Sequence, residues 1–294
     1  MEPVPPPAAT LASNLDHQPI VDWQVPAAQL HPRPAYPTLG ESWAIVGWYL
    51  LATLVAGGAS YLLLAATTAL PRVQQLLLAA AAANVALLAF LRWKAGTRRQ
   101  SWEFLGQARA WHFAALPAVV VAGQLLLSLL HYLHLPDTTG AKFQELSNSL
   151  VAALLLGAVA APVLEELLFR GLVLNGLLRN CPPWAAIGQS ALLFGLIHFN
   201  PAQSMSAGML GLLLGWLYYR TRSLGLCVVL HAVNNGLGLA AMHLATPAIQ
   251  KAESMADVFG SSGQYIGSLL VSAVVLAGYL WGVQRTTQIE PATL

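Results

Sequence analysis

A long apolar run from Leu150 to Leu178 contains two adjacent acidic residues, Glu165 and Glu166. An ionisable group at the centre of a membrane helix costs about 2.5–3.5 kcal/mol or more, and it usually persists because function needs it. Arg170 lies four residues after Glu166 on the same helix face, so we expect these two side chains to pair. Glu165 projects about 100° away around the helix and is expected to be the carboxylate that stays free to react.

The other ten acidic residues are expected in tails and loops, which leaves the adjacent pair as the buried acids. These ten residues are Glu2, Asp16, Asp22, Glu41, Glu103, Asp137, Glu145, Glu253, Asp257 and Glu290.

Composition predicts an integral membrane protein. Charged residues make up 9% of the chain, against roughly 25% in an average soluble protein, and 56% of the residues are hydrophobic. Apolar segments close to the ~20 residues that a helix needs to cross a bilayer predict an all-α, polytopic helix bundle with about eight transmembrane helices. The expected spans are about 43–69, 73–91, 111–134, 149–178, 184–199, 204–219, 224–243 and 264–284.

The chain divides by composition into four parts. Nine of the 18 prolines fall in the first 40 residues, and proline at this density blocks both helix and sheet. Residues 1–42 are therefore predicted to be a disordered or loosely docked tail. We predict N-terminal transmembrane helices in 43–145, a catalytic helical core in 146–245, and a loop, the last transmembrane helix and a short tail in 246–294.

Lysine and arginine predict the orientation, because the cytoplasmic side of a membrane protein keeps an excess of positive charge. Both termini are expected in the cytoplasm, with 11 basic residues on or toward that side and 3 outside. The inner set is Arg33, Arg92, Lys94, Arg98, Arg99, Arg109, Arg170, Arg179, Arg220, Arg222 and Arg285, and the outer set is Arg72, Lys142 and Lys251. The net charge of +2 gives no reason to expect nucleic-acid binding.

Two further predicted spans carry polar residues at helical spacing. Phe194 and His198 are four residues apart, as are His231 and Asn235, so each pair shares a helix face. A lone histidine in a membrane helix is often only a hydrogen-bonded packing residue. Two such histidines in a chain that also buries a double glutamate favour a functional site.

This residue set permits two kinds of hydrolysis. Glutamate can act as general base toward water when desolvation raises its pKa, with a histidine sharing that water and a second histidine and an asparagine stabilising an oxyanion. Alternatively, Glu165, His198 and His231 could hold zinc with one position left open. Spacing alone does not separate these alternatives. Other intramembrane hydrolase designs are disfavoured, because the chain has no Gly-x-Ser-x-Gly, His-Glu-x-x-His or Gly-Asp sequence.

Three motifs in order, Glu165-Glu166-x-x-x-Arg170, Phe194-x-x-x-His198 and His231-x-x-x-Asn235, resemble the signature of the CPBP family. This family comprises CAAX prenyl endopeptidases of the Rce1 type and bacterial relatives linked to peptide processing and bacteriocin immunity. The resemblance covers about 145–245, so the predicted core is CPBP-like. It implies intramembrane proteolysis, with a membrane-anchored protein or peptide as substrate and the lipid bilayer as surroundings.

The resemblance also implies roles for six catalytic residues. Glu165 and His198 would activate water, Glu166 and Arg170 would form an orienting pair, and His231 and Asn235 would make the oxyanion site. We favour a reaction without a cofactor, with zinc on Glu165, His198 and His231 as the alternative. His198, late in the fifth span, is expected closer to the outer side than Glu165 near mid-membrane, which suits cytosolic CAAX processing poorly.

The competing class is a non-catalytic or proton-coupled membrane protein, such as a transporter, an immunity protein or a scaffold that retains the fold. Buried acids with histidines also serve proton-coupled transport. Against a transporter, the chain shows no pair of Gly/Pro-interrupted spans in corresponding halves.

Overall fold

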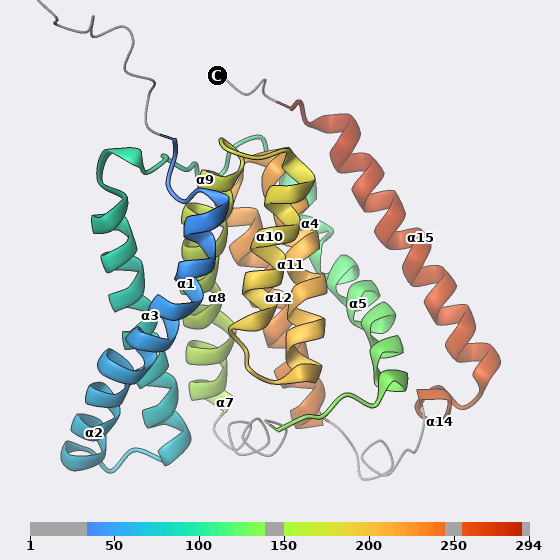
Figure 1. Cartoon of the computed structure of the whole chain (residues 1–294). Helices are drawn as coiled ribbons and strands as arrows, with labels where there is room; N and C mark the ends of the chain where they lie inside the picture. The colour runs from blue at the N-terminus through green and yellow to red at the C-terminus, as the bar shows by residue number, and fades with distance from the viewer. Residues whose placement is uncertain (1–33, 139–149, 245–254, 290–294) are drawn as a thin grey trace, which may run out of the picture. The chain divides into compact units, whose positions relative to one another are not determined.

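The computed structural model describes residues 34–138, 150–244 and 255–289, and these form one helical unit (Figure 1). Within the described residues there is no β-strand, and the extended contact between Glu103 and Ser223 is an isolated bridge. The predicted all-α fold is confirmed. Most of the tail predicted for 1–42 lies outside the described residues.

The first half of the unit has two long N-terminal helical segments, Leu39–Thr67 and Arg72–Arg98, followed by shorter helices. Its elements are α1 (Leu39–Ala52), η2 (Thr53–Gly57), α2 (Gly58–Thr67), α3 (Arg72–Ala95), η3 (Gly96–Arg98), α4 (Ala110–Ala114), α5 (Leu116–Leu127) and η4 (Ser128–Leu133).

The second half carries the predicted motifs. Its elements are α7 (Leu150–Ala152), η5 (Ala153–Ala160), α8 (Ala161–Glu166), η6 (Leu167–Leu174), α9 (Asn175–Leu177), α10 (Pro183–Leu196), α11 (Pro201–Thr221), α12 (Leu224–Leu244), α14 (Met255–Phe259) and α15 (Ser262–Thr286). The elements from α7 to α9 form one continuous rod, in which η5 and η6 are wider π-helical stretches.

Six helices among the described residues are long and apolar enough to cross a membrane. They are Leu39–Thr67, Arg72–Arg98, Leu116–Leu133, Leu150–Leu177, Leu224–Leu244 and Ser262–Thr286. The remaining two of the eight predicted spans correspond to α10 and α11. Helix α10 has only 14 residues, and α11 carries polar residues near both ends, including Gln203 and Arg220.

The motif-bearing helices lie between two outer groups (Figure 1). Helices α1 and α3 contact α10 and α8 on one side, and α5 and α15 contact α12 and α11 on the other. Helices α10 and α11 approach closely at Gly195, where an added Cβ would lie 2.6 Å from the carbonyl oxygen of Ser204. Glycine is therefore needed there for the hairpin that carries His198.

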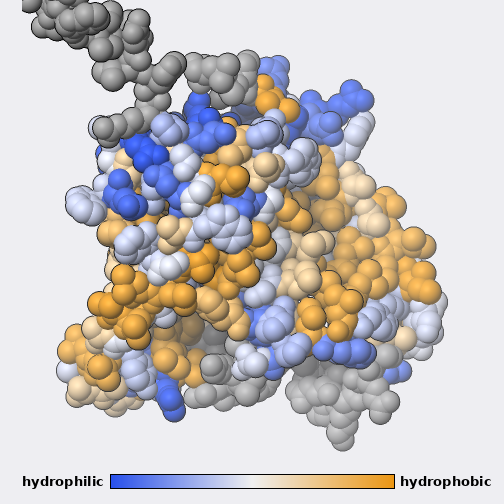
Figure 2. Space-filling view, in the orientation of Figure 1, coloured by the Kyte–Doolittle hydropathy of each residue, from blue (hydrophilic) through white to orange (hydrophobic). Residues whose placement is uncertain are grey.

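Apolar side chains are exposed on the outer helices, as a bilayer requires. Leu54, Leu62 and Leu63 of η2 and α2, and Val271 and Val274 of α15, are 60% exposed or more. Figure 2 shows these hydrophobic surfaces at the lower left and the right, with hydrophilic residues gathered at the upper end. The protein is thus an integral, multi-pass membrane protein.

One end of the unit collects the basic loops. The backbone N–H of Gln107 donates to Thr221, its side chain donates to the Gln288 carbonyl, and Asn180 donates to the Ala35 carbonyl. These bonds bring together the loops that carry seven arginines of the predicted inner set. They are Arg98, Arg99, Arg109, Arg179, Arg220, Arg222 and Arg285.

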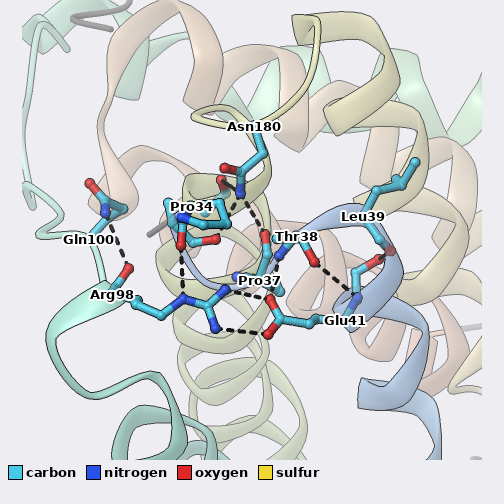
Figure 3. A network of polar contacts seen from close by, with 11 residues as sticks. Pro34, Pro37, Thr38, Leu39, Glu41, Arg98, Gln100 and Asn180 are labelled. Atoms are coloured by element: carbon cyan, nitrogen blue, oxygen red, sulfur yellow. Dashed lines mark hydrogen bonds and ion pairs between the residues drawn. The ribbon is translucent and has the colours of Figure 1, made fainter. Parts of the chain in front are cut away.

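A polar network at this end fastens the start of α1 (Figure 3). Arg98 donates to both oxygens of Glu41, at 2.9 and 2.7 Å, and to the Pro34 carbonyl at 2.8 Å. Thr38 and Glu41 cap α1 reciprocally. Burial and the Glu41 carboxylate raise the pKa of Tyr36 to about 12, so this buried phenol stays neutral at physiological pH.

Candidate active site

The two adjacent glutamates lie at the end of α8, between the π-helical stretches η5 and η6. Pro162 near the start of α8 has no backbone N–H to donate to the preceding turn, and the chain before it adopts wider turns. π-Helical turns inside longer helices occur frequently at functional sites. Local sequence thus distorts the rod beside the glutamates.

Glu166 is fully buried and anchors a three-residue network. Its Oε1 accepts hydrogen bonds from Arg170 Nη1 at 2.8 Å and from His231 Nδ1 at 2.8 Å. Arg170 is also fully buried, and its Nη2 donates to the Gly211 carbonyl at 3.1 Å. The i,i+4 pairing expected for Glu166 and Arg170 is therefore present, and it extends to a histidine 65 residues away in sequence.

Glu165 is more accessible than its neighbour. Its side chain is 18% exposed, and its Oε2 lies 3.8 Å from His231 Nε2. Two adjacent carboxylates thus have different surroundings, one locked by two donors and the other partly open. This is the difference expected between an orienting carboxylate and a reacting one.

The Phe194 ring is the centre around which the site is assembled. This buried ring makes edge-on contacts with His198 at 5.2 Å and His231 at 5.6 Å between centroids, and the Arg170 guanidinium lies 4.8 Å from its centroid. Phe194 is therefore a packing residue that brings the three motifs together.

His198 lies on the turn that follows α10. Its Nδ1 donates to the Phe194 carbonyl oxygen at 2.8 Å, because that oxygen can only accept. This bond places a hydrogen on Nδ1, so in the neutral imidazole Nε2 carries the lone pair. His198 can consequently accept a proton at Nε2.

His198 and Glu165 lie at similar depths, contrary to the expectation that His198 is closer to the outer side. The rod ends at Leu177 and α10 begins at Pro183, at the same end of the bundle. Glu165 is 12 residues before that end of the rod and His198 is 15 residues after the start of α10. At about 1.5 Å per residue, these are ~18 and ~22 Å. The short α10 removes the mismatch.

Asn235 lies one turn after His231 on α12. Its Nδ2 donates to the Gly157 carbonyl in η5 at 3.0 Å, and its Oδ1 accepts from Asn234 at 3.3 Å. One of its two amide hydrogens is thus engaged, and the other is available for a ligand. Arg170, His198 and His231 contact Phe194, and the two glutamates join this cluster through His231. Asn235 lies one turn further along α12, against η5.

The predicted zinc ligands do not form a three-ligand set. In the parts of the chain that the structure describes, no group of three or more His, Cys, Asp or Glu side chains is arranged to hold a metal ion. Glu165 lies 3.8 Å from His231 Nε2, and the two histidines use Nδ1 in hydrogen bonds to Glu166 and to the Phe194 carbonyl. Such bonds also orient zinc-ligating histidines, so it is the lack of a three-ligand grouping that disfavours zinc here.

Sequence reasoning missed three partners of the site. These are the contact between His231 and Glu166, and the carbonyls of Gly211 and Gly157 that accept from Arg170 and Asn235. Every residue presents a carbonyl, so side-chain motifs carry no signal for these two contacts.

Comparison with known proteins finds a family match over the segment that carries the three motifs. Residues 147–237 match a family described as type II CAAX prenyl endopeptidase Rce1-like, which confirms the resemblance drawn from the three motifs. All six predicted site residues lie inside the matched segment. No curated protein and no solved structure matches the chain. The name of the matched family describes endopeptidases of prenylated CAAX proteins.

Proposed function

Because residues 147–237 are Rce1-like, we propose that the protein is an intramembrane endopeptidase that cleaves a membrane-anchored protein or peptide with water activated by Glu165 and His198. The observation that carries the proposal is the contrast between the two glutamates. Glu166 is buried and doubly hydrogen-bonded, whereas Glu165 is 18% exposed beside His231.

In this reaction Glu165 removes a proton from water as the water oxygen bonds to the substrate carbonyl carbon. The carbonyl π electrons move onto oxygen, which becomes an oxyanion. When the C–N bond breaks, its electron pair leaves with nitrogen, and the proton returns from Glu165, directly or through His198 Nε2. The products are a carboxylic acid and an amine. General acid–base catalysis of this kind contributes ~10²–10⁴-fold to a rate.

Glu166, Arg170 and His231 act as an orienting network. Glu166 fixes the Nδ1–H tautomer of His231, so that Nε2 points to the side on which Glu165 lies. A carboxylate that holds a histidine in one tautomer performs the same task in hydrolytic triads. The second amide hydrogen of Asn235 can donate to the oxyanion, and His231 Nε2 can do so while it shares the proton that Glu165 has taken from water.

We propose that this reaction uses no metal. The site offers one carboxylate and two histidines, and among the described residues these side chains do not gather as three ligands. Stoichiometric zinc in active enzyme, lost together with activity on chelation and regained with it, would contradict this part of the proposal.

We further propose that both termini face the cytoplasm. The start of α1 and the end of α15 lie at the end of the unit that collects the arginine-bearing loops (Figure 1). Positive charge is retained on the cytoplasmic side. Glu165 and His198 then lie about 20 Å below that surface, within the bilayer.

The first test is Glu165→Gln in cells and in liposomes. Mass spectrometry of membrane proteins from cells with the wild-type chain or the variant should show at least one terminus that depends on Glu165. The purified full chain should cleave the corresponding peptide, or a quenched peptide ending in S-farnesylcysteine and three residues, and Glu165→Gln should be slower by ~10²–10⁴-fold while folding normally.

Glu103→Gln is the matched control, because this exposed side chain lies in a loop at the other end of the unit from the turn that carries His198. It should cleave like the wild type. No changed terminus, no peptide cleavage and proton or solute flux in liposomes would overturn the peptidase proposal and favour a transport protein.

A further inference from the structure

The proposed reaction leaves the oxyanion short of hydrogen-bond donors. Neutral His198 and His231 use their Nδ1 hydrogens on Phe194 and Glu166, so each presents a lone pair at Nε2. Asn235 uses one amide hydrogen on Gly157. Oxyanion sites normally supply preorganised donors, and the loss of one costs ~10²–10³-fold in rate. Asn235 thus supplies one donor as long as His231 is neutral, and a further neutral donor near Glu165 would complete the site.

Tyr49 of α1 lies beside the turn that carries His198. Its ring lies 6.4 Å from that of Phe199, the residue after His198, and its hydroxyl is within electrostatic range of the Glu165 carboxylate. It lies outside the Rce1-like segment, so motif analysis of that segment does not find it. A phenol is neutral at physiological pH and remains a donor there.

Asn84 of α3 lies near the Tyr49 hydroxyl. Asn84 Nδ2 is anchored to the Ala80 carbonyl at 3.0 Å, while its Oδ1 is buried with no hydrogen-bond partner among the described residues. A buried polar atom without a partner needs an explanation, and a polar ligand bound beside Tyr49 is one.

The position of Tyr49 is set by contacts further along α1. Ser42, Ile45 and Tyr49 follow i, i+3, i+7 spacing and share one helix face. Ser42 and Ile45 are buried, and the Ser42 hydroxyl accepts from Gln189 of α10 at 3.0 Å. The Arg98–Glu41 contact in Figure 3 fixes the first turn of the same helix. Helix α1 is thus held in one rotation against the helix that leads to His198.

We propose that Tyr49 is a catalytic residue whose hydroxyl donates a hydrogen bond to the oxyanion of the tetrahedral intermediate. This inference rests on the proposed peptidase function. The N-terminal helices then complete an active site to which the Rce1-like segment contributes only part of the donors.

The test is Tyr49→Phe in the full chain, reconstituted in liposomes and assayed with the peptides described above. Removing only the hydroxyl should lower kcat by ~10²-fold with KM unchanged within about twofold, because the lost bond forms in the transition state. Tyr132→Phe is the matched control, because this 51%-exposed tyrosine lies in η4, away from α1. Its turnover should equal that of the wild type.

A second variant separates catalysis from packing. Site-specific difluorotyrosine at position 49 keeps the size and the hydroxyl but is a more acidic phenol. If the protonated hydroxyl donates, activity should disappear at a lower pH than in the wild type, whereas a packing role would leave the pH profile unchanged. This variant also serves if Tyr49→Phe does not fold.

The outcomes separate the two proposals. Wild-type kcat in Tyr49→Phe, with an inactive Glu165→Gln, would overturn the role of Tyr49 and leave the peptidase intact. A raised KM with unchanged kcat would show ground-state binding and also overturn the oxyanion role. Absence of cleavage by the wild type would overturn both.

Discussion

Two arginine–glutamate pairs in this protein have the same chemistry and opposite surroundings. Arg170 and Glu166 are one helical turn apart and completely buried, whereas Arg98 and Glu41 are 57 residues apart with 23% and 33% of their side chains exposed. The exposed pair is bidentate, and Arg98 Nε also donates to the Pro34 carbonyl. The buried pair has one bond between the partners, and Arg170 Nε and Glu166 Oε2 have no hydrogen-bond partner among the residues that the structure describes.

The difference indicates what each pair is for. A buried ion pair is weak evidence for stability, because desolvation can exceed the Coulombic gain. A carboxylate oxygen without a hydrogen bond adds to the desolvation cost. We therefore explain the buried pair by its contact with His231 and not by a gain in stability. The Arg98–Glu41 pair satisfies all of its groups and joins three backbone segments, which suits a structural clamp.

The largest expected effect is that of Arg170→Met. It leaves Glu166 buried without its cation, which typically costs about 3–5 kcal/mol, and it releases His231 from a fixed carboxylate. We expect a lower apparent Tm in detergent together with loss of peptide cleavage. The same substitution in the exposed pair, Arg98→Met, is the control and should change stability far less, since exposed pairs contribute about 0.2–1 kcal/mol.

Equal stability losses in Arg170→Met and Arg98→Met would contradict the comparison. An inactive Arg170→Met that melts like the wild type would show that Arg170 acts on the substrate instead of holding Glu166.

Much of the fold could be predicted because bilayer-spanning helices must satisfy their backbone internally and be apolar along about 20 residues. The span expected at 149–178 is observed as Leu150–Leu177. The observed helices depart from the predicted spans at a proline and at a short segment. Pro117 starts α5, so the span expected at 111–134 divides into α4, α5 and η4, and α10 turns back after 14 residues.

The site could be predicted only where its contacts are local. Glu166 and Arg170 pair as their i,i+4 spacing requires, whereas the bond from His231 to Glu166 joins α12 to α8 across 65 positions. Tyr49 has no motif and lies in a helix expected only to span the membrane. Its relation to Glu165 depends on how α1 packs, which periodicity does not determine.

Asn235→Ala tests whether the catalytic role that we assign to the buried pair and His231 extends one turn further along α12. If the free amide hydrogen donates to the oxyanion, kcat should fall by ~10²–10³-fold with little change in KM. Asn234→Ala is the companion variant. It keeps the bond from Gln124 to the Asn234 carbonyl at 2.9 Å and removes only the bond to Asn235 Oδ1 at 3.3 Å, so kcat should fall less than in Asn235→Ala. If both variants raise KM alone, Asn235 contributes to substrate binding or to the packing of η5.

The smallest expected effect concerns the clamp itself, and a double-mutant cycle with Glu41→Gln and Arg98→Met measures it. Because both side chains are partly exposed, water screens their attraction, and the coupling should be at most about 1 kcal/mol and should shrink as salt rises from low concentration to 1 M. Turnover should fall only modestly, through loosening of α1 beside Tyr49. A coupling of several kcal/mol that ignores salt would show that the Arg98–Glu41 pair behaves as a buried one, and the contrast between the two pairs would then fail.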